Sequence, residues 1–148
     1  MKTVKEVMRK NVPNVSPDDT LEKVSQLMKE HNIGGVPVVD DGKIVGILTD
    51  GDMLNAFYLN VSSFSYEEKM DGGRENGAFK KRLEEFKSTR VKDIMTSHPR
   101  TISENAGVDE AAALIKRFKI KRLIVVNAKG DPVGLAERLN LVNSILLS

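Results

Sequence analysis

The second half of this chain of 148 residues repeats the first half, and an internal repeat restricts the possible folds more than any other feature does. The segment VKEVM at residues 4–8 returns as VKDIM at residues 91–95. After each copy the sequence shows the same order of helix, strand, turn, strand and helix. We therefore expect two copies of one unit, at residues 1–59 and 91–148, separated by an insert at residues 60–90.

Within each repeat, apolar residues first follow a helical spacing and then form short strand-like runs. Asp19 or Thr20 is a candidate cap for the first helix. A unit of about 55 residues has too little core to be stable alone, so the two units should pack together. The pattern predicts a mixed α/β (α+β) fold of two pseudo-twofold-related β-α-β-β-α units packed sheet against sheet, with ligand clefts at their interface. The expected elements are helices over 21–31 and 108–118, strands at 36–39, 44–49, 123–126 and 132–137, and final helices over 53–58 and 139–146.

Composition and charge exclude several classes of function. The chain has no cysteine, which excludes disulfides and thiolate-bound metals, and its two histidines leave little imidazole for a metal site. The 23 basic and 21 acidic residues leave a net charge of +2, which is not the pattern of a nucleic-acid binder. Neither an export signal nor an apolar run long enough to cross a bilayer is visible. We expect a cytoplasmic protein that binds no metal, membrane or nucleic acid.

The insert between the repeats carries one helical pattern. Phe79, Leu83 and Phe86 recur at helical spacing among charged residues, which predicts a short amphipathic helix. Residues 71–77 read as a flexible loop, because glycine and polar residues dominate them. The helix either packs its apolar stripe on the rest of the chain as a connector, or contacts another subunit or partner.

Short motifs follow one another in a fixed order in both repeats. The second repeat contains VKDIM, then TIS, a helix, IKRLIVV and VG, and the first repeat adds GILTDGD at residues 46–52. This order resembles the CBS (cystathionine β-synthase) domain, whose G-x-x-[ST]-x-x-D signature is similar to residues 46–52. The resemblance covers nearly the whole chain outside residues 60–90. It implies a tandem CBS pair, or Bateman module, that senses AMP, ADP, ATP or S-adenosylmethionine and often dimerises.

Thr49 and Asp52 are the most informative polar residues of this signature. Thr49 should end a strand just before a helix, where its hydroxyl and the free backbone N–H groups can hold a phosphate. Asp52 lies one turn further along and has acceptors for both hydroxyls of a ribose. Alternatively, both residues only cap the helix. The resemblance favours ligand binding.

The resemblance also implies that the adenine pocket comes from the other repeat. Apolar side chains there can sandwich a purine, and backbone groups beside the strand can read its edge. Ordinary core packing or solvent exposure is the alternative for each residue. By position, the pocket would consist of Thr101, Ile102, Ala106, Ile120 and Lys121.

Basic residues are placed unevenly between the repeats. Lys121 and Arg122 precede a strand of the second repeat, where the family often places phosphate contacts. The first repeat has Gly34 and Gly35 at the matching positions. Two explanations stay open: Lys121 or Arg122 reaches across the pseudo-twofold axis, or the ligand carries little negative charge, as S-adenosylmethionine does.

A second cleft has a weaker signature. Glu137 stands in place of the hydroxyl residue and Asn140 in place of the aspartate. A glutamate repels a phosphate, and an amide binds a hydroxyl less strongly than a carboxylate does. The other residues expected in this cleft are Val15, Ser16, Ile33 and Pro37.

The sequence brings together no nucleophile, base and oxyanion donors, and it lacks phosphate-loop and dinucleotide-binding motifs. We therefore expect no enzymatic activity. The main hypothesis is a regulatory module that binds an adenosine-containing ligand and changes the arrangement of its repeats or subunits. It would form a homodimer and act on a separate effector protein. The alternative is a ligand-free scaffold for dimerisation or protein interaction.

Overall fold

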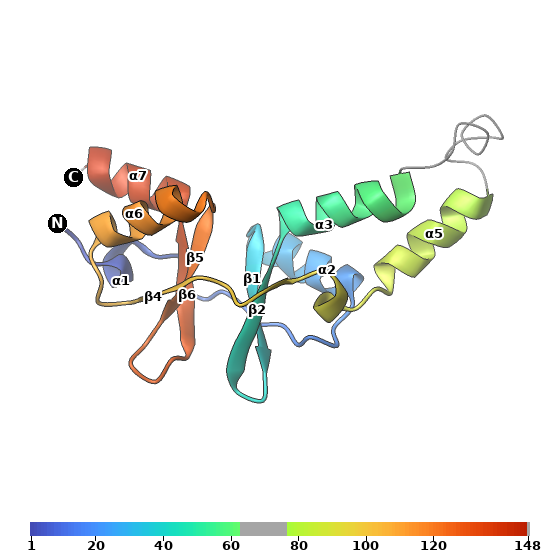
Figure 1. Cartoon of the computed structure of the whole chain (residues 1–148), viewed down its shortest axis with the longest axis horizontal. Helices are drawn as coiled ribbons and strands as arrows, with labels where there is room; N and C mark the ends of the chain where they lie inside the picture. The colour runs from blue at the N-terminus through green and yellow to red at the C-terminus, as the bar shows by residue number, and fades with distance from the viewer. Residues whose placement is uncertain (63–76, 148) are drawn as a thin grey trace.

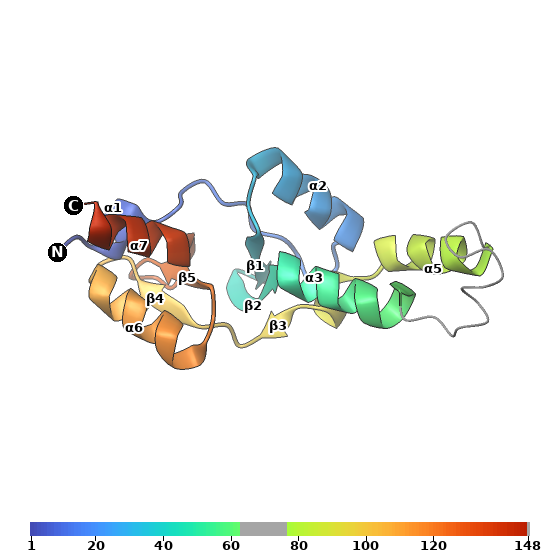
Figure 2. The ribbon, with the colours of Figure 1, turned by 90° about the horizontal axis from the view of Figure 1, so that it is seen from above.

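A computed structural model describes residues 1–62 and 77–147, which form two lobes side by side (Figures 1 and 2). The order of helices and strands predicted for both repeats is confirmed. The first lobe contains α2 (Leu21–His31), β1 (Gly35–Asp40), β2 (Lys43–Thr49) and α3 (Asp50–Phe57), which continues as the π-helical turn η1 (Tyr58–Ser62). The second lobe contains β4 (Thr101–Ser103), α6 (Val108–Phe118), β5 (Arg122–Val126), β6 (Pro132–Glu137) and α7 (Arg138–Leu146).

Local turns place equivalent segments at equivalent points of the two lobes. The Thr20 hydroxyl caps α2 by accepting the Lys23 N–H at 3.2 Å. Asn32 caps the C-terminus of α2 and Lys119 caps that of α6, both with left-handed backbones (φ 51° and 54°) that turn the chain into the next strand. The segments that follow these turns, residues 33–35 and 120–122, therefore lie in matching positions.

Each lobe holds one three-stranded sheet, and the sheets pack against each other. The first sheet has the order β1-β2-β3, where β3 is Thr96–Ser97, and the second has the order β4-β5-β6. A buried cluster of Ile47 from β2, Ile124 from β5 and Leu135 from β6 joins them. The prediction of two units packed through their sheets is confirmed.

The VKEVM and VKDIM segments are exchanged between the lobes. The first forms α1 (Val4–Val7), and Val4 is buried in the core of the second lobe beside Val108. The second forms the 3₁₀ turn η3 (Val91–Asp93), and Val91 is buried in the core of the first lobe. Matching backbone hydrogen bonds hold both arms: the Val4 N–H donates to the Ala106 carbonyl and the Val91 N–H to the Asp19 carbonyl, each at 2.8 Å. The first segment of each sequence repeat therefore belongs to the core of the other lobe.

This exchange explains why both repeats contain a glycine in the second strand of the hairpin. Each arm continues across the other lobe, where Thr96 pairs with Ile47 and Arg9 pairs with Leu135. A Cβ on Gly134 would lie 2.5 Å from the Arg9 carbonyl oxygen, and one on Gly46 would lie 2.9 Å from that of Thr96. Any larger residue would push the exchanged arm off the sheet.

The insert contributes the predicted amphipathic helix as α5 (Gly77–Lys87), which lies beside η1 at the far end of the first lobe (Figure 1). The Phe86 ring lies 5.8 Å from the Phe57 ring in an edge-to-face contact and packs on the first core. The end of the helix that carries Phe86 thus packs as a connector. The predicted loop at 71–77 falls outside the described residues except for Gly77.

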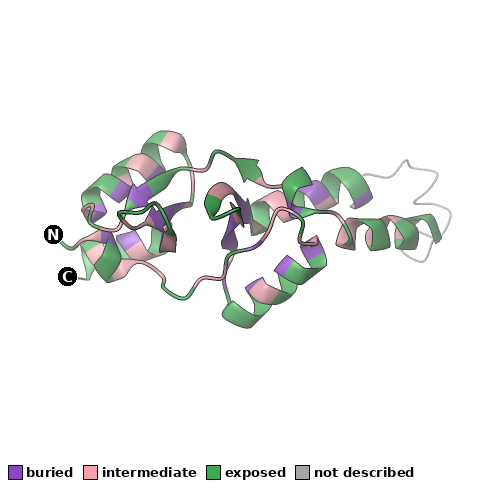
Figure 3. Ribbon diagram, turned by 90° about the horizontal axis from the view of Figure 1, so that it is seen from below, coloured by how far each residue is buried: buried purple, intermediate pink, exposed green. Residues whose placement is uncertain are grey.

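Figure 3 shows that buried residues follow the sheets and the helix faces against them, while much of α3 and α7 is exposed. On α7, Leu141 is buried, whereas other apolar residues predicted for its packing face are exposed. The largest exposed apolar side chains of the two final helices and their extensions are Leu54, Tyr58, Leu59, Leu139, Leu146 and Leu147.

Candidate functional site

A cavity of about 270 Å³ lies between the lobes at the N-terminus of α3. Its volume is near the lower end of the ~300–1,000 Å³ typical of small-molecule sites. Five residues predicted for the ligand site line it: Thr49, Asp52, Ile120, Lys121 and Arg122. The first lobe supplies two of these and the second lobe three, so the cavity is a true inter-lobe site.

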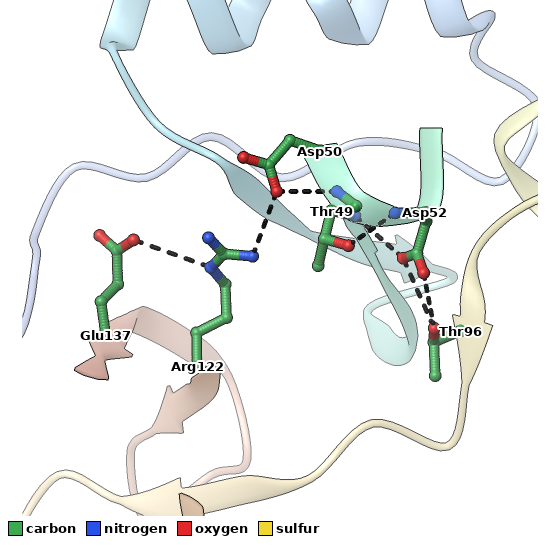
Figure 4. A network of polar contacts seen from close by, with 7 residues as sticks. Thr49, Asp50, Asp52, Thr96, Arg122 and Glu137 are labelled. Carbon is green, nitrogen blue, oxygen red and sulfur yellow. Dashed lines mark hydrogen bonds and ion pairs between the residues drawn. The ribbon is translucent and has the colours of Figure 1, made fainter. Parts of the chain in front are cut away.

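Thr49 and Asp52 form a reciprocal capping box at the start of α3 (Figure 4). The Asp52 N–H donates to Thr49 Oγ1 at 3.1 Å, and the Thr49 N–H donates to Asp52 Oδ2 at 3.1 Å. Both side chains therefore cap the helix, as one of the two interpretations expects. Capping also fixes their orientation at the cavity, so it does not exclude ligand binding.

The exchanged arm adds Thr96 to the site. Its hydroxyl donates to Asp52 Oδ1 at 3.3 Å (Figure 4). Each oxygen of an ionised carboxylate has two acceptor positions, so Asp52 Oδ1 keeps one for a ligand. The capping box and Thr96 together hold Asp52 in place beside the cavity.

Arg122 connects the two lobes across the axis between them. Its Nη1 lies 3.7 Å from Asp50 Oδ1 in the first lobe, and its Nε lies 3.7 Å from Glu137 Oε2 in the second (Figure 4). These distances are ion pairs but exceed hydrogen-bond length. The Arg122 side chain is only 12% exposed, and its buried Nε has no hydrogen-bond partner among the described residues. A buried donor without an acceptor is unusual, and here the nearest acceptor is the Glu137 carboxylate at 3.7 Å.

Gly34 and Gly35 make room for this arginine. A Cβ on Gly35 would lie 2.7 Å from Arg122 Cδ, and one on Gly34 would lie 2.9 Å from Arg122 Nη2. The positions that match Lys121 and Arg122 in the first lobe are therefore empty of side chains because Arg122 occupies that space. Of the two explanations for the uneven basic residues, the geometry agrees with an arginine that crosses between the lobes.

The other residues predicted for the adenine pocket do not line this cavity. Thr101 is exposed on β4. Ile102 is buried in the core of the second lobe, because side chains alternate along the strand and this one faces inward. Ala106 is half-buried against the same core.

Sequence reasoning missed four lining residues: Ile47, Asp50, Gly51 and Thr96. Three of them lie inside the GILTDGD motif, where their proximity to Thr49 and Asp52 was a usable signal. Thr96 directly follows the second VKDIM motif, and only the exchange of the arms brings it to Asp52.

At the second cleft, the signature residues Glu137 and Asn140 make contacts within the protein. The Glu137 N–H donates to Asn140 Oδ1 at 3.3 Å, and the Glu137 carboxylate faces Arg122. Val15, Ile33 and Pro37 are buried, the first two in the core of the first lobe. The Ser16 N–H donates to Asp19 Oδ2 at 2.8 Å in the turn before α2.

The described part of the chain lacks two further kinds of site. Across residues 1–62 and 77–147, no group of three His, Asp or Glu side chains is arranged to hold a metal ion. In the same ranges no helix combines the length and apolar character needed to cross a bilayer.

The family model of the CBS domain matches residues 4–59 and again residues 91–146. A CBS domain-containing protein of Dictyostelium discoideum is 31% identical over 144 residues, which are 97% of this chain and 90% of the relative. An inosine-5'-monophosphate dehydrogenase of Korarchaeum cryptofilum is 35% identical over 126 residues. This chain spans only 21% of that dehydrogenase, and 64% of the chloroplastic protein CBSX1 of Arabidopsis thaliana, to which it is 31% identical.

Solved structures resemble the chain over nearly its whole length. CBSX2 in complex with AMP superposes with a TM-score of 0.71 at 26% identity, covering 99% of this chain and 98% of that one. The CBS domain pair of MJ0100, in complex with 5'-methylthioadenosine and S-adenosyl-L-methionine, superposes with a TM-score of 0.75 at 21% identity. That pair covers 98% of this chain, and at this identity it supports the fold alone.

Proposed function

The chain belongs to the CBS-domain family as a tandem pair, and from this premise we propose that it binds an adenosine-containing ligand in the cavity between its lobes. One observation carries the proposal: a fixed carboxylate from the first lobe and two cations from the second line the same cavity. Occupancy would favour one arrangement of the lobes over another, because a ligand shifts an equilibrium by its differential affinity for the two states.

Asp52 is proposed to hold the ribose. A vicinal diol offers two donors, and an oriented carboxylate accepts both in charge-assisted hydrogen bonds. Ile47 and Ile120 line the cavity from opposite lobes and would cover the faces of the adenine ring. Thr101, Ile102 and Ala106 lie outside the lining of this cavity, and their part in adenine recognition stays a prediction from the resemblance.

Lys121 and Arg122 are proposed to hold a phosphate, which makes AMP the preferred ligand over S-adenosylmethionine. Arg122 is paired with Asp50 and Glu137 only at 3.7 Å, and Lys121 forms no ion pair with the described residues. A phosphate dianion complements these cations. The sulfonium and ammonium groups of S-adenosylmethionine would meet like charges instead.

Calorimetric titration of the purified chain with AMP, ADP, ATP and S-adenosylmethionine tests the proposal. We expect AMP to bind at one site per chain, and 2'-deoxy-AMP to bind more weakly because it lacks one donor to Asp52. If none of the four ligands binds below about 1 mM, equivalent to roughly −4 kcal/mol, the proposal fails.

The exposed apolar residues of α3 and α7 support a second proposal, that the chain forms a homodimer. Leu54 and Leu139 are 70% and 68% exposed at the start of these two helices, and such groups of exposed apolar side chains mark interaction surfaces. We propose that a second molecule of this chain covers them. Sedimentation velocity should show a dimer for the parent chain and a monomer for the Leu54→Asp/Leu139→Asp variant.

We further propose that the chain has no catalytic activity of its own. The carboxylates of the cavity engage in capping and ion pairs, and the Thr96 hydroxyl that donates to Asp52 belongs to the same capping network. Incubation with each of the four ligands followed by chromatography should return the ligand unchanged. Turnover that disappears in a Thr49→Ala variant would contradict this.

A further inference from the structure

The carboxylate of Asp50 lies beside the cations that are proposed to hold the phosphate, and it carries the same sign of charge as that phosphate. Asp50 is the first residue of α3 and lines the ligand cavity together with Lys121 and Arg122. Its side chain is 67% exposed. The cavity therefore contains an anion of its own at the place where an anionic group of the ligand is expected.

One oxygen of this carboxylate contacts two groups that would otherwise be available to a phosphate. Asp50 Oδ1 accepts the Gly51 N–H at 2.8 Å. The same oxygen lies 3.7 Å from Arg122 Nη1 in the second lobe (Figure 4). A backbone N–H at the start of a helix and a guanidinium are both common partners of phosphate. Asp50 thus takes the part of an anionic ligand toward both groups.

The contact between Asp50 and Arg122 can be exchanged while the rest of the site stays as it is. Its length exceeds that of a hydrogen bond, and an ion pair with one exposed partner contributes little to stability. Arg122 itself is held in place, since Gly34 and Gly35 lie against its side chain. Its Nε also faces the Glu137 carboxylate in its own lobe. A phosphate that enters the cavity therefore competes with Asp50 for a guanidinium that is already oriented.

The charges that line the cavity match one phosphate better than several. The lining holds two cations, Lys121 and Arg122, and two carboxylates, Asp50 and Asp52. A phosphate monoester carries about −1.5 to −2 charges at pH 7, which the two cations balance. A second or third phosphate would meet no further cation among these lining residues, and the Asp50 carboxylate would repel it.

We propose that Asp50 is an internal competitor of the ligand phosphate and makes the cavity selective for adenosine ligands with one phosphate. This role rests on the function proposed above, and it names the residue that discriminates AMP from ADP and ATP. Glu137 also lies 3.7 Å from Arg122, but it belongs to the second lobe and is 22% exposed. Because Glu137 does not line the cavity, its charge does not face the ligand as that of Asp50 does.

An Asp50→Asn variant tests this role, since it removes the charge but keeps an oxygen for the Gly51 N–H. Calorimetry should compare the parent chain and the variant with adenosine, AMP, ADP and ATP. The affinity for adenosine should change by less than about twofold, that for AMP should rise about threefold, and that for ATP about tenfold, because the gain grows with the charge of the ligand. A purely structural effect of the substitution would not follow ligand charge.

Glu137→Gln is the matched control, because it removes the same charge at the same distance from Arg122 but outside the cavity. It should raise the affinity for ATP by less than about threefold. The role of Asp50 is overturned, and the proposed function stands, if AMP binds the parent chain but Asp50→Asn leaves the affinity for ATP unchanged or lowers it. An equal gain in Glu137→Gln would overturn it as well. If neither the parent chain nor Asp50→Asn binds any of the four ligands, the proposed function fails and the role of Asp50 fails with it.

Discussion

The two lobes share the same helices, strands and exchanged arms, but four matching positions that contribute to the cavity differ in chemistry. Gly46 and Gly134 are alike because both lobes must let an arm cross the sheet. One member of each of these pairs lines the cavity: Gly35 against Arg122, Thr49 against Glu137, Asp50 against Arg138, and Asp52 against Asn140. The glycines that let the arms cross are thus duplicated, whereas these four positions have diverged, which brings the Asp52 carboxylate and the Arg122 guanidinium to one cavity.

Alanine substitution of Gly46 or Gly134 should give the largest losses of stability. The two losses should differ, because the two arms meet the added Cβ with different atoms. Gly134→Ala should lower the free energy of unfolding by about 3 kcal/mol, because its Cβ would meet the Arg9 backbone oxygen at 2.5 Å. Gly46→Ala should cost less, about 1–2 kcal/mol, because its closest atom is the flexible Met95 Sδ at 2.6 Å. Urea unfolding measures both.

The control is Gly77→Ala at the start of α5, where no atom lies within 4 Å of the added Cβ. It should change the free energy of unfolding by less than about 1 kcal/mol, and in the stabilising direction. Equal losses for all three variants would contradict the role assigned to the exchanged arms.

Exchanging the signature residues should show which lobe binds the ligand. Asp52→Asn keeps an oxygen to cap α3 but removes the charge, so it should weaken AMP binding about tenfold, or about 1.4 kcal/mol. The reciprocal Asn140→Asp in the second lobe should change AMP affinity by less than about twofold. Calorimetry would contradict the assignment if Asn140→Asp had the larger effect.

Much of this arrangement was predictable from the sequence, and the reason is periodicity. Helical spacing and the doubled VKEVM/VKDIM motif predict both lobes and their sheet packing, and the signature predicts Thr49 and Asp52 at the cavity. The arm exchange was not predictable, since a motif shows what it resembles but not which core it enters. Thr96 was missed for this reason. Whether Ile102 faces a cavity or a core depends on which side of the short strand β4 points inward. A strand of three residues is too short for its sequence pattern to determine this.

The contact between Gly35 and Arg122 should contribute less to stability than the crossing glycines do. Its contribution should also depend on the presence of the arginine. Gly35→Ala would place a Cβ 2.7 Å from Arg122 Cδ and force the arginine away from Asp50 and Glu137, at a cost of about 1 kcal/mol. In an Arg122→Ala background the same substitution should cost almost nothing. A double-mutant cycle by urea unfolding measures this coupling, and additive losses would contradict the contact.

The smallest expected effect on stability comes from the charge of Asp19, which the second lobe lacks at the matching position. Its counterpart is Ala106, and both carbonyls accept an arm N–H, but only Asp19 adds a charged side chain. Burial raises the pKa of Asp19, but the Ser16 N–H, the Lys23 ammonium at 3.0 Å and the charge of Arg90 outweigh this and lower the pKa below its ordinary value. A depressed pKa in the folded state stabilises the fold above the unfolded pKa of about 3.9, and this stabilisation is lost as pH falls through the folded value.

Asp19→Asn, which keeps an acceptor for the Ser16 N–H, should therefore lower the free energy of unfolding at pH 7 by up to about 1 kcal/mol. The difference from the parent chain should shrink below about pH 4 as the parent carboxylate becomes protonated. Asp40→Asn is the control, because Asp40 is exposed and forms no ion pair with the described residues, so it should show no such pH dependence. A loss for Asp19→Asn that stays constant from pH 7 to pH 2 would mean that the amide disturbs the turn sterically, and that the charge of Asp19 does not distinguish the two arms.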